Sequence, residues 1–128
     1  MIVGIGSDIV HIPRMQRNLE RYGDQFARRI LAESEWPDYR RSANPAQLLA
    51  KRFAAKEAVS KALGTGFRNG LFLRHISVTH DEYGRPLLVF AAKASQIIAD
   101  LGVTHSHVSL SDEREYAIAF VTLEKAPT

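Results

Sequence analysis

Hydrophobic and polar positions in the first thirty residues predict a strand followed by a helix. The segment Ile2–Gly6 is typical of a short strand, and residues 7–10 carry that strand to its end. Pro13 fits the first turn of a helix, where its missing N–H is not needed. Gly23 is a predicted break in this helix. The apolar residues that recur at helical spacing are Met15, Leu19, Tyr22 and Phe26.

The most apolar helix is predicted over residues 45–63. Asn44 is a favourable N-cap, Pro45 fits the first helical position, and Gly64 is a typical residue to end the helix after Leu63. Apolar residues occupy nearly every side of this helix. We therefore expect it to be buried rather than to lie on the surface.

Strand patterns dominate the second half of the chain. Residues 76–79 and 86–90 read as a hairpin joined by a polar turn at residues 81–84. A helix is expected over residues 91–101, ended by Gly102, with three residues facing inward: Ile97, Ile98 and Leu101. Two final strands are expected around residues 107–111 and 115–124, joined by a turn of Asp112, Glu113 and Arg114. This order of elements predicts an α+β fold, mostly antiparallel sheet with helices packed against it.

Length and composition favour one soluble domain over residues 1–128. Hydrophobic residues make up 45% and charged residues 24% of the chain, which is typical of a globular protein. The sequence has no cysteine, so disulfides, thiolate metal sites and a cysteine nucleophile are excluded. The longest apolar run, residues 87–92, is far shorter than the ~20 residues of a membrane helix, and no signal peptide is visible. We therefore expect a cytoplasmic protein without membrane contact.

Basic residues are concentrated in the first half of the chain. The formal net charge is +3, from 17 Lys and Arg and 14 Asp and Glu. Residues 1–66 hold 11 basic and 7 acidic groups, whereas residues 67–128 hold 6 and 7. The bias indicates an acidic partner, which could be nucleic acid, an acidic protein or a phosphorylated cofactor. On one continuous helix, four arginines would share a narrow face: Arg14, Arg17, Arg21 and Arg28.

Two charged groups in apolar surroundings are candidates for chemistry. Glu57 and Lys61 lie four residues apart on the buried helix, where they could form an ordinary i,i+4 ion pair or part of a site. Small apolar neighbours favour a site, because desolvating such charges is expensive without a ligand or metal. Asp8 follows a glycine-containing strand and could equally be a turn or capping residue.

Glycines and histidines match none of the common ligand motifs. The segment Gly64–Gly66 is either a helix stop or a set of amides close to a phosphate, and it lacks the ending of a nucleotide-hydrolase phosphate loop. Gly4 and Gly6 lack the third glycine of a dinucleotide fingerprint. His105 and His107 share a strand face, but they lack the further ligands of a zinc site.

Three segments together resemble the holo-acyl-carrier-protein synthases. The opening Gly-Ile-Gly-Ser-Asp-Ile-Val at residues 4–10 resembles the family's Gly-x-Gly-Thr-Asp-Ile-Val. Residues 52–66 are similar to its signature helix, Phe/Trp-x-x-Lys-Glu-Ala-x-x-Lys. The tail, residues 107–119, is similar to its closing strands. The resemblance covers nearly the whole chain and keeps the order and spacing of the motifs.

The resemblance implies a reaction. Enzymes of this family transfer 4′-phosphopantetheine from coenzyme A to a serine of apo-acyl carrier protein and release adenosine 3′,5′-bisphosphate, in support of fatty acid biosynthesis. Asp8 and Glu57 match the two carboxylates that bind Mg²⁺, and Lys61 matches the motif lysine at the reacting phosphate. The catalytic base is either Glu57 or a metal-bound water. The implied cofactor-binding positions are Arg52, Lys61, Gly64, Arg85 and Pro86.

The resemblance also implies partners. The family docks its acidic carrier protein on the first helix; Arg14 matches that surface, and Arg17, Arg21 and Arg28 are added from the face geometry. Family members this short form homotrimers. His11 stands where many members have Glu, and Asp112 where some have His near the cofactor phosphates, which leaves a role for position 112 open.

Two other functions compete with this hypothesis. A basic α+β module that binds nucleic acid or an acidic protein would explain the arginines. It would not explain Asp8, Glu57 and Lys61 together, and the chain lacks the interleaved aromatic residues of a single-strand binder. We therefore expect no nucleic-acid partner. A different phosphate-transfer enzyme on the same scaffold is distinguished only by substrate tests.

Overall fold

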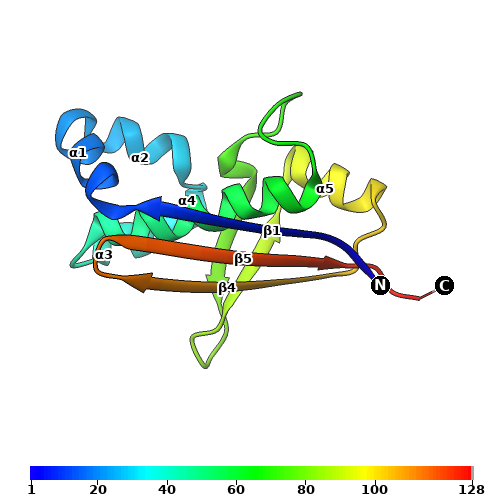
Figure 1. Cartoon of the computed structure of the whole chain (residues 1–128). Coiled ribbons are helices and arrows are strands. Elements are labelled where there is room, and N and C mark those ends of the chain that lie inside the picture. Colours follow the sequence, from blue (N-terminus) through cyan, green and yellow to red (C-terminus); the bar gives the residue numbers. More distant parts are fainter. Residues whose placement is uncertain (128) are drawn as a thin grey trace.

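A three-stranded antiparallel sheet with one long helix against it forms the centre of the computed structural model, which describes residues 1–127 (Figure 1). The strand order is β1-β5-β4, where β1 is Ile2–His11, β5 is Tyr116–Glu124 and β4 is His105–Glu113. Strand β5 pairs antiparallel with both neighbours, so residues far apart in sequence lie side by side. The expected α+β class is confirmed.

Helix α4 (Pro45–Leu63) has the bounds predicted from the sequence. The side chain of Asn44 accepts a hydrogen bond from the backbone N–H of Gln47, and Gly64 ends the helix in the left-handed conformation. Twelve of its nineteen residues are buried, which confirms that it is a core helix. Its central position gives it contacts with β1, β5, α1 and α2.

Two short helices follow strand β1 at one end of the sheet. Helix α1 is Ile12–Tyr22 and helix α2 is Asp24–Ile30. Gly23 between them has φ 60° and ψ −139°, a backbone conformation that suits glycine, so the predicted break is confirmed. The break changes the chain direction, and the single-helix geometry that placed Arg28 on one face with the α1 arginines was therefore wrong.

The sequence predicted no element between residues 31 and 43, where the structure has two. A 3₁₀ turn, η1 (Glu33–Glu35), leads into helix α3 (Trp36–Arg41). Both elements are shorter than two turns of α-helix, so no hydrophobic period develops in the sequence. The same segment holds Glu35, a buried carboxylate described below.

The second half of the chain agrees with the predicted hairpin and partly with the predicted helix. A short turn, η2 (Leu73–His75), leads into strand β2 (Ile76–His80), which pairs with β3 (Pro86–Phe90) in a separate two-stranded sheet. Helix α5 is Ala92–Asp100. The expectation that Leu101 faces inward was wrong: it follows the last helical residue and is 37% exposed.

Strand β4 is longer than expected, whereas β5 begins one residue later than expected. Pairing of β4 with β5 continues to Glu113 and Tyr116, so the turn consists of Arg114 and Glu115 rather than Asp112, Glu113 and Arg114. Arg114 has a positive φ of 47°, which allows this tight connection. Asp112 therefore belongs to strand β4 and not to the turn.

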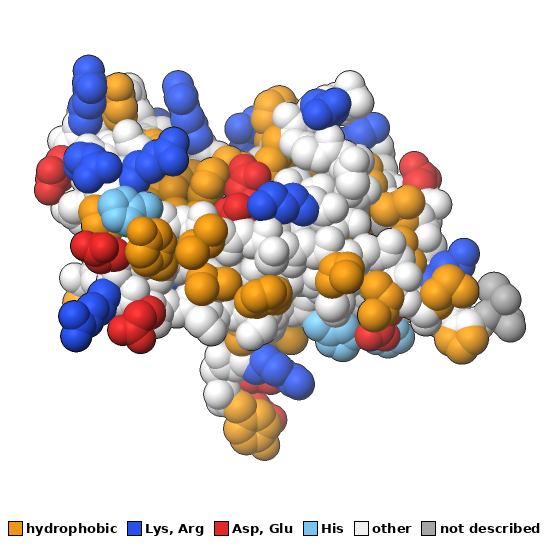
Figure 2. Space-filling view, in the orientation of Figure 1, with side chains coloured by type: hydrophobic (Ala, Val, Ile, Leu, Met, Phe, Trp, Pro, Cys, Tyr) orange, Lys and Arg blue, Asp and Glu red, His pale blue; other side chains and the backbone are white. Residues whose placement is uncertain are grey.

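The two faces of the three-stranded sheet differ in character. Alternate side chains of β1 and β5 point toward α4 and are buried. The residues between them form an exposed apolar row on the opposite face: Ile5, Ile9, Tyr116 and Phe120. Figure 2 shows hydrophobic side chains along this sheet and Lys and Arg side chains gathered over α1 and α2.

The chain termini lie together at the end of the sheet away from α1 and α2 (Figure 1). The terminal amino group of Met1 donates a 3.0 Å hydrogen bond to the backbone oxygen of Lys125. The backbone N–H of Lys125 donates a 2.8 Å bond in return to the oxygen of Met1. Met1 and Lys125 are thus held beside each other.

Candidate active site

Strand β1 lies directly against helix α4 at two glycines. A Cβ added to Gly4 would lie 1.9 Å from the carbonyl oxygen of Ala62, and one added to Gly6 would lie 1.9 Å from that of Ala58. Alternate strand residues share a face, as do helix residues four apart, so the two pairs form one line of backbone contact. The next residue on this face of β1 is Asp8, which therefore lies beside α4.

Lys61 joins Asp8 to the C-terminal part of α4. Its Nζ lies 3.1 Å from Oδ1 of Asp8 and donates a 2.8 Å hydrogen bond to the backbone oxygen of Ser7. The side chain of Asp8 is 16% exposed and that of Lys61 is 54% exposed. Of the alternatives left open by the sequence, the i,i+4 ion pair is not formed within residues 1–127, because Lys61 pairs with Asp8 and not with Glu57.

Glu57 lies one helical turn before Lys61 and is partly buried. Burial raises the pKa of the Glu57 carboxyl, the negative charge of Asp8 raises it further, and the positive charge of Lys61 opposes the shift. Strand β1 and helix α4 thus bring two carboxylates and one ammonium group together. Carboxylates can hold a hard cation, and an ammonium group can hold a phosphate.

Glu57 borders two cavities on different sides. One, of about 390 Å³, lies between β1, α1, α2 and α4 and is bordered by Asp8, His11, Arg14, Phe26, Phe53 and Glu57, among others. The other, of about 530 Å³, lies along the loop after α4 and is bordered by Arg29, Glu57, Phe67, Arg68, Phe72 and Arg74, among others. Three arginines give the second cavity a positive lining that suits an anion.

The segment Gly64–Gly66 mainly ends helix α4. The backbone N–H of Gly64 donates to the oxygen of Lys61, and the next two amides donate to the oxygen of Ser60. These bonds occupy the amides that a phosphate would need, so the expected contact of Gly64 with a cofactor is not supported. The hydroxyl of Thr65, by contrast, is buried and has no hydrogen-bond partner within residues 1–127.

Arg85 is the last residue of the turn between β2 and β3, and Pro86 is the first residue of β3. This hairpin projects past β4 on the side of the sheet away from β1 (Figure 1). The backbone N–H of Arg85 donates a 2.9 Å bond to Asp81, and its Nε lies 3.3 Å from the same carboxylate. These donors, led by the Arg85 backbone, lower the pKa of Asp81. Within one copy of the chain, the hairpin tip is not brought to Asp8 and Glu57.

Arg52 is placed in the core rather than beside Lys61. It is 5% exposed, and its two terminal nitrogens lie 3.1 Å from Glu35 and 3.2 Å from Asp38. It also borders a separate surface pocket of about 270 Å³ with Lys51 and others. Both terminal nitrogens of Arg52 are held by carboxylates, and its contact with a cofactor phosphate stays a prediction.

The arginines proposed for carrier-protein docking are exposed but do not form one face. Arg14 lies at the edge of the smaller cavity, and Arg17 and Arg21 lie on the same helix, α1. Arg28, on α2, instead borders a pocket with Trp36 and Arg74, among others. The Lys and Arg side chains over α1 and α2 nevertheless form a broad positive surface (Figure 2).

His11 and Asp112, the two residues that depart from the family pattern, each contact a neighbouring side chain. His11 borders the smaller cavity and packs against Tyr116, with ring centroids 5.3 Å apart. Asp112 lies 3.2 Å from Nζ of Lys51 and accepts a hydrogen bond from Gln47, so it is tied to the start of α4.

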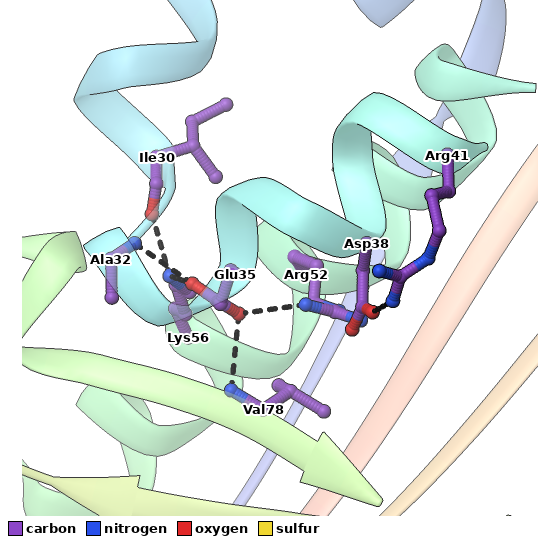
Figure 3. Close-up of polar contacts among 8 residues, drawn as sticks. All are labelled: Ile30, Ala32, Glu35, Asp38, Arg41, Arg52, Lys56 and Val78. Carbon is purple, nitrogen blue, oxygen red and sulfur yellow. Dashed lines mark hydrogen bonds and ion pairs between the residues drawn. The ribbon is translucent and has the colours of Figure 1, made fainter.

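One buried charged network was not predicted from the sequence. Glu35, which is 1% exposed, accepts hydrogen bonds from Arg52 and from the fully buried Lys56 (Figure 3). Burial lowers the pKa of Lys56, and the charge of Glu35 opposes this shift. The available signal was on helix α4, where Lys56 belongs to the signature motif and shares a helix face with Arg52, four residues before it.

Residues 1–127 contain neither a metal cluster of three protein ligands nor a helix that could span a membrane. Among residues 1–127, His, Asp and Glu side chains form no cluster of three or more that could hold a metal ion, so a cation beside Asp8 would have two protein carboxylates at most. None of the helices described is both long and apolar enough to cross a membrane.

Comparison with known proteins finds the same family over the whole length. The model of the 4′-phosphopantetheinyl transferase superfamily matches residues 4–121. The chain is 52% identical over 125 residues to a holo-[acyl-carrier-protein] synthase of Nitrosospira multiformis, covering 98% of this chain and 100% of that protein.

Solved structures agree with the sequence relatives. The synthase of Neisseria meningitidis matches with a TM-score of 0.92 at 41% identity, covering 98% of this chain and 100% of that one. The Bacillus anthracis synthase in complex with CoA (3′,5′-ADP) matches with a TM-score of 0.81 at 36% identity, covering 98% and 99%. On these matches, the chain belongs to the 4′-phosphopantetheinyl transferase superfamily.

Proposed function

We propose that this protein transfers 4′-phosphopantetheine from coenzyme A to a serine hydroxyl of apo-acyl carrier protein. The products are holo-acyl carrier protein and adenosine 3′,5′-bisphosphate. The observation that carries the proposal is the position of Glu57, which lies beside Asp8 and borders two cavities. A transfer between two substrates needs a central group that both can approach.

The two cavities suit a donor and an acceptor. The larger one has three arginines, which match the phosphates of coenzyme A, and the unpartnered hydroxyl of Thr65 lies in the segment that leads into it. The smaller one opens toward Arg14 on α1, on the side where an acidic carrier protein would dock. The relatives' name, holo-[acyl-carrier-protein] synthase, fits these two substrates.

The reaction balances with groups that this chain supplies. The serine oxygen attacks the phosphorus next to pantetheine, the bond to the bridging pyrophosphate oxygen breaks, and adenosine 3′,5′-bisphosphate leaves. Glu57, whose pKa is raised by burial, accepts the serine proton directly or through a water molecule. Lys61, held by Asp8, places a positive charge where the phosphate carries negative charge.

Asp8 and Glu57 are the residues that would hold Mg²⁺. The raised pKa of Glu57, caused in part by the charge of Asp8, fits a cation between the two carboxylates. Mg²⁺ is commonly bound by one or two carboxylates together with water and substrate phosphates, which agrees with the small number of protein ligands here. When bound, the ion would neutralise charge on the pyrophosphate.

We further propose that the protein acts in the cytoplasm as a homotrimer, where its product supports fatty acid biosynthesis. Two features support the assembly: the exposed apolar row on the sheet, and a hairpin that carries Arg85 and Pro86 away from its own Asp8. Phe120→Asp is expected to convert the protein to monomers by light scattering, whereas Leu101→Ser, at an exposed residue outside that row, leaves its mass unchanged.

Mass spectrometry tests the reaction. The protein is incubated with coenzyme A, Mg²⁺ and apo-acyl carrier protein, and the carrier is expected to gain about 340 Da. Glu57→Gln and a chelator should each abolish the gain. A folded protein that binds coenzyme A but modifies none of several carriers would contradict the proposed acceptor. A protein that neither modifies a carrier nor binds coenzyme A would contradict the proposal altogether.

A further inference from the structure

Glu35 is a buried carboxylate, and each of its two oxygens accepts two hydrogen bonds (Figure 3). Oε1 accepts hydrogen bonds from the backbone N–H of Ala32, at 2.9 Å, and from Nζ of Lys56. Oε2 accepts from the backbone N–H of Val78, at 3.0 Å, and from Arg52, at 3.1 Å. This one side chain therefore connects η1, α4 and β2.

Lys56 extends the connection to helix α2. Its ammonium group is fully buried and donates a second hydrogen bond, 2.6 Å long, to the backbone oxygen of Ile30. Ile30 is the last residue of α2, so its carbonyl group lacks a partner within that helix. Lys56 supplies that partner and fixes the end of α2 to the middle of α4.

The hydrogen bond between Lys56 and Ile30 lies close to residues of α4 and α2 that border the smaller cavity. On α4, Lys56 immediately precedes Glu57, so a rotation of the helix that moved one would move the other. On α2, Phe26 lies one turn before Ile30 and borders the smaller cavity together with Phe53 and Glu57. The distance between α2 and α4 at Lys56 therefore sets the width of that cavity.

Stability alone is a weak reason for such a network. Replacing a buried ion pair with well-packed apolar side chains is often neutral or stabilising, because desolvation offsets the attraction between the charges. The hydrogen bonds are directional, however, and they constrain four elements at once. The network therefore fixes the relative orientation of these elements, which an apolar contact would not do.

We propose that Glu35 and Lys56 are positioning residues that hold Glu57 and the α2 wall of the cavity in the arrangement needed for transfer to the acceptor serine. This inference rests on the function proposed above. It assigns neither residue a contact with substrate. It predicts that weakening the network lowers the rate of transfer while coenzyme A, which enters from the other cavity, still binds.

Lys56→Met is the primary test, because Met has a similar shape and Glu35 keeps Arg52 and two amide donors. We expect kcat to fall at least tenfold while KM for coenzyme A changes less than threefold. In hydrogen exchange, amides of α2 should exchange at least tenfold faster, and those of β4 and β5 should be unchanged. Leu123→Ala, a fully buried change at the far end of β5, should lower Tm but keep kcat within twofold.

A double variant separates positioning from stability. Glu35→Gln leaves the cation of Lys56 without its charged partner and should lower Tm strongly. Adding Lys56→Met removes that buried cation and should recover part of the loss in Tm but none of the loss in kcat. Recovery of wild-type kcat by the double variant would overturn the inference, as would unchanged α2 exchange in Lys56→Met. The wild-type protein tests the proposed function separately. If it transfers no phosphopantetheine, the proposed function is wrong. The hydrogen-exchange data would still decide whether the network fixes α2.

Discussion

The carboxyl group of Glu57 is partly buried beside Asp8. Burial raises its pKa, and the negative charge of Asp8 raises it further. In the pH range between its pKa in the unfolded chain, about 4.3, and its higher pKa in the fold, the folded protein binds more protons than the unfolded chain. The free energy of unfolding therefore decreases as the pH rises through that range. At neutral pH, the charge on Glu57 weakens the fold.

Glu57→Gln should accordingly separate activity from stability. We expect transfer to fall at least ~100-fold, because a proton acceptor is removed. The free energy of unfolding, measured by urea denaturation at pH 7 with a chelator present, should increase. At pH 4, below the ordinary pKa of a glutamate, the difference should shrink. A variant less stable than wild type at pH 7 would show that the charge of Glu57 is compensated in the fold.

At the scale of elements, the contact between β1 and α4 decides where the site lies. Gly4 and Gly6 let the strand backbone touch the helix backbone at Ala62 and Ala58. Any side chain there would separate the two elements. The distance between Asp8 and the α4 residues thus depends on backbone contact rather than on the packing of flexible side chains.

Gly6→Ala should push β1 away from α4. Its Cβ would lie 1.9 Å from the carbonyl oxygen of Ala58, a backbone atom that cannot move without bending the helix. We expect a loss of at least ~3 kcal/mol in the free energy of unfolding, measured with denaturant. Ser7→Ala, at the exposed neighbouring position on β1, should change it by less than ~0.5 kcal/mol.

Elements with a strong local signal were predictable, and those defined by distant partners were not. Helix α4 combines a cap, a long apolar run and a stop glycine, and its bounds agree with the prediction. Helix α3 has six residues and no period, and the partners of its neighbour Glu35 come from α4, from β2 and from the backbone of Ala32. Asp8, Glu57 and Lys61 could be predicted as site residues because they match the opening motif and the signature helix of a known family. The position of Arg28 was not predictable because the chain changes direction at Gly23, and that of Arg52 was not predictable because distant carboxylates hold it in the core.

At the scale of the whole molecule, positive charge is concentrated over one end. The arginines of α1 and α2 lie at the end of the sheet opposite the termini, and Arg14 among them borders the cavity with Asp8 and Glu57 (Figures 1 and 2). Charge of this kind mainly raises the rate of encounter with an oppositely charged partner. Under the proposed function, this surface would bring an acidic carrier protein to the cavity that Asp8 and Glu57 border.

Arg14→Glu should slow modification of an acidic carrier protein by roughly tenfold or more at low salt, through kcat/KM for the carrier. Added salt should reduce the difference from wild type, because it screens both proteins. Lys125→Glu, which makes the same charge change at the opposite end of the sheet, should have little effect. Equal effects of the two substitutions would indicate that net charge, rather than this surface, guides the carrier.

The pairing of Met1 with Lys125 has a consequence for attaching this protein to other molecules. Both ends of the chain emerge side by side, away from the arginine-rich helices (Figure 1). A fusion partner or surface tether at either terminus would leave that end of the molecule open to a carrier protein. A short linker could also join the termini, so that circular permutation could place new ends in an exposed loop away from the candidate site.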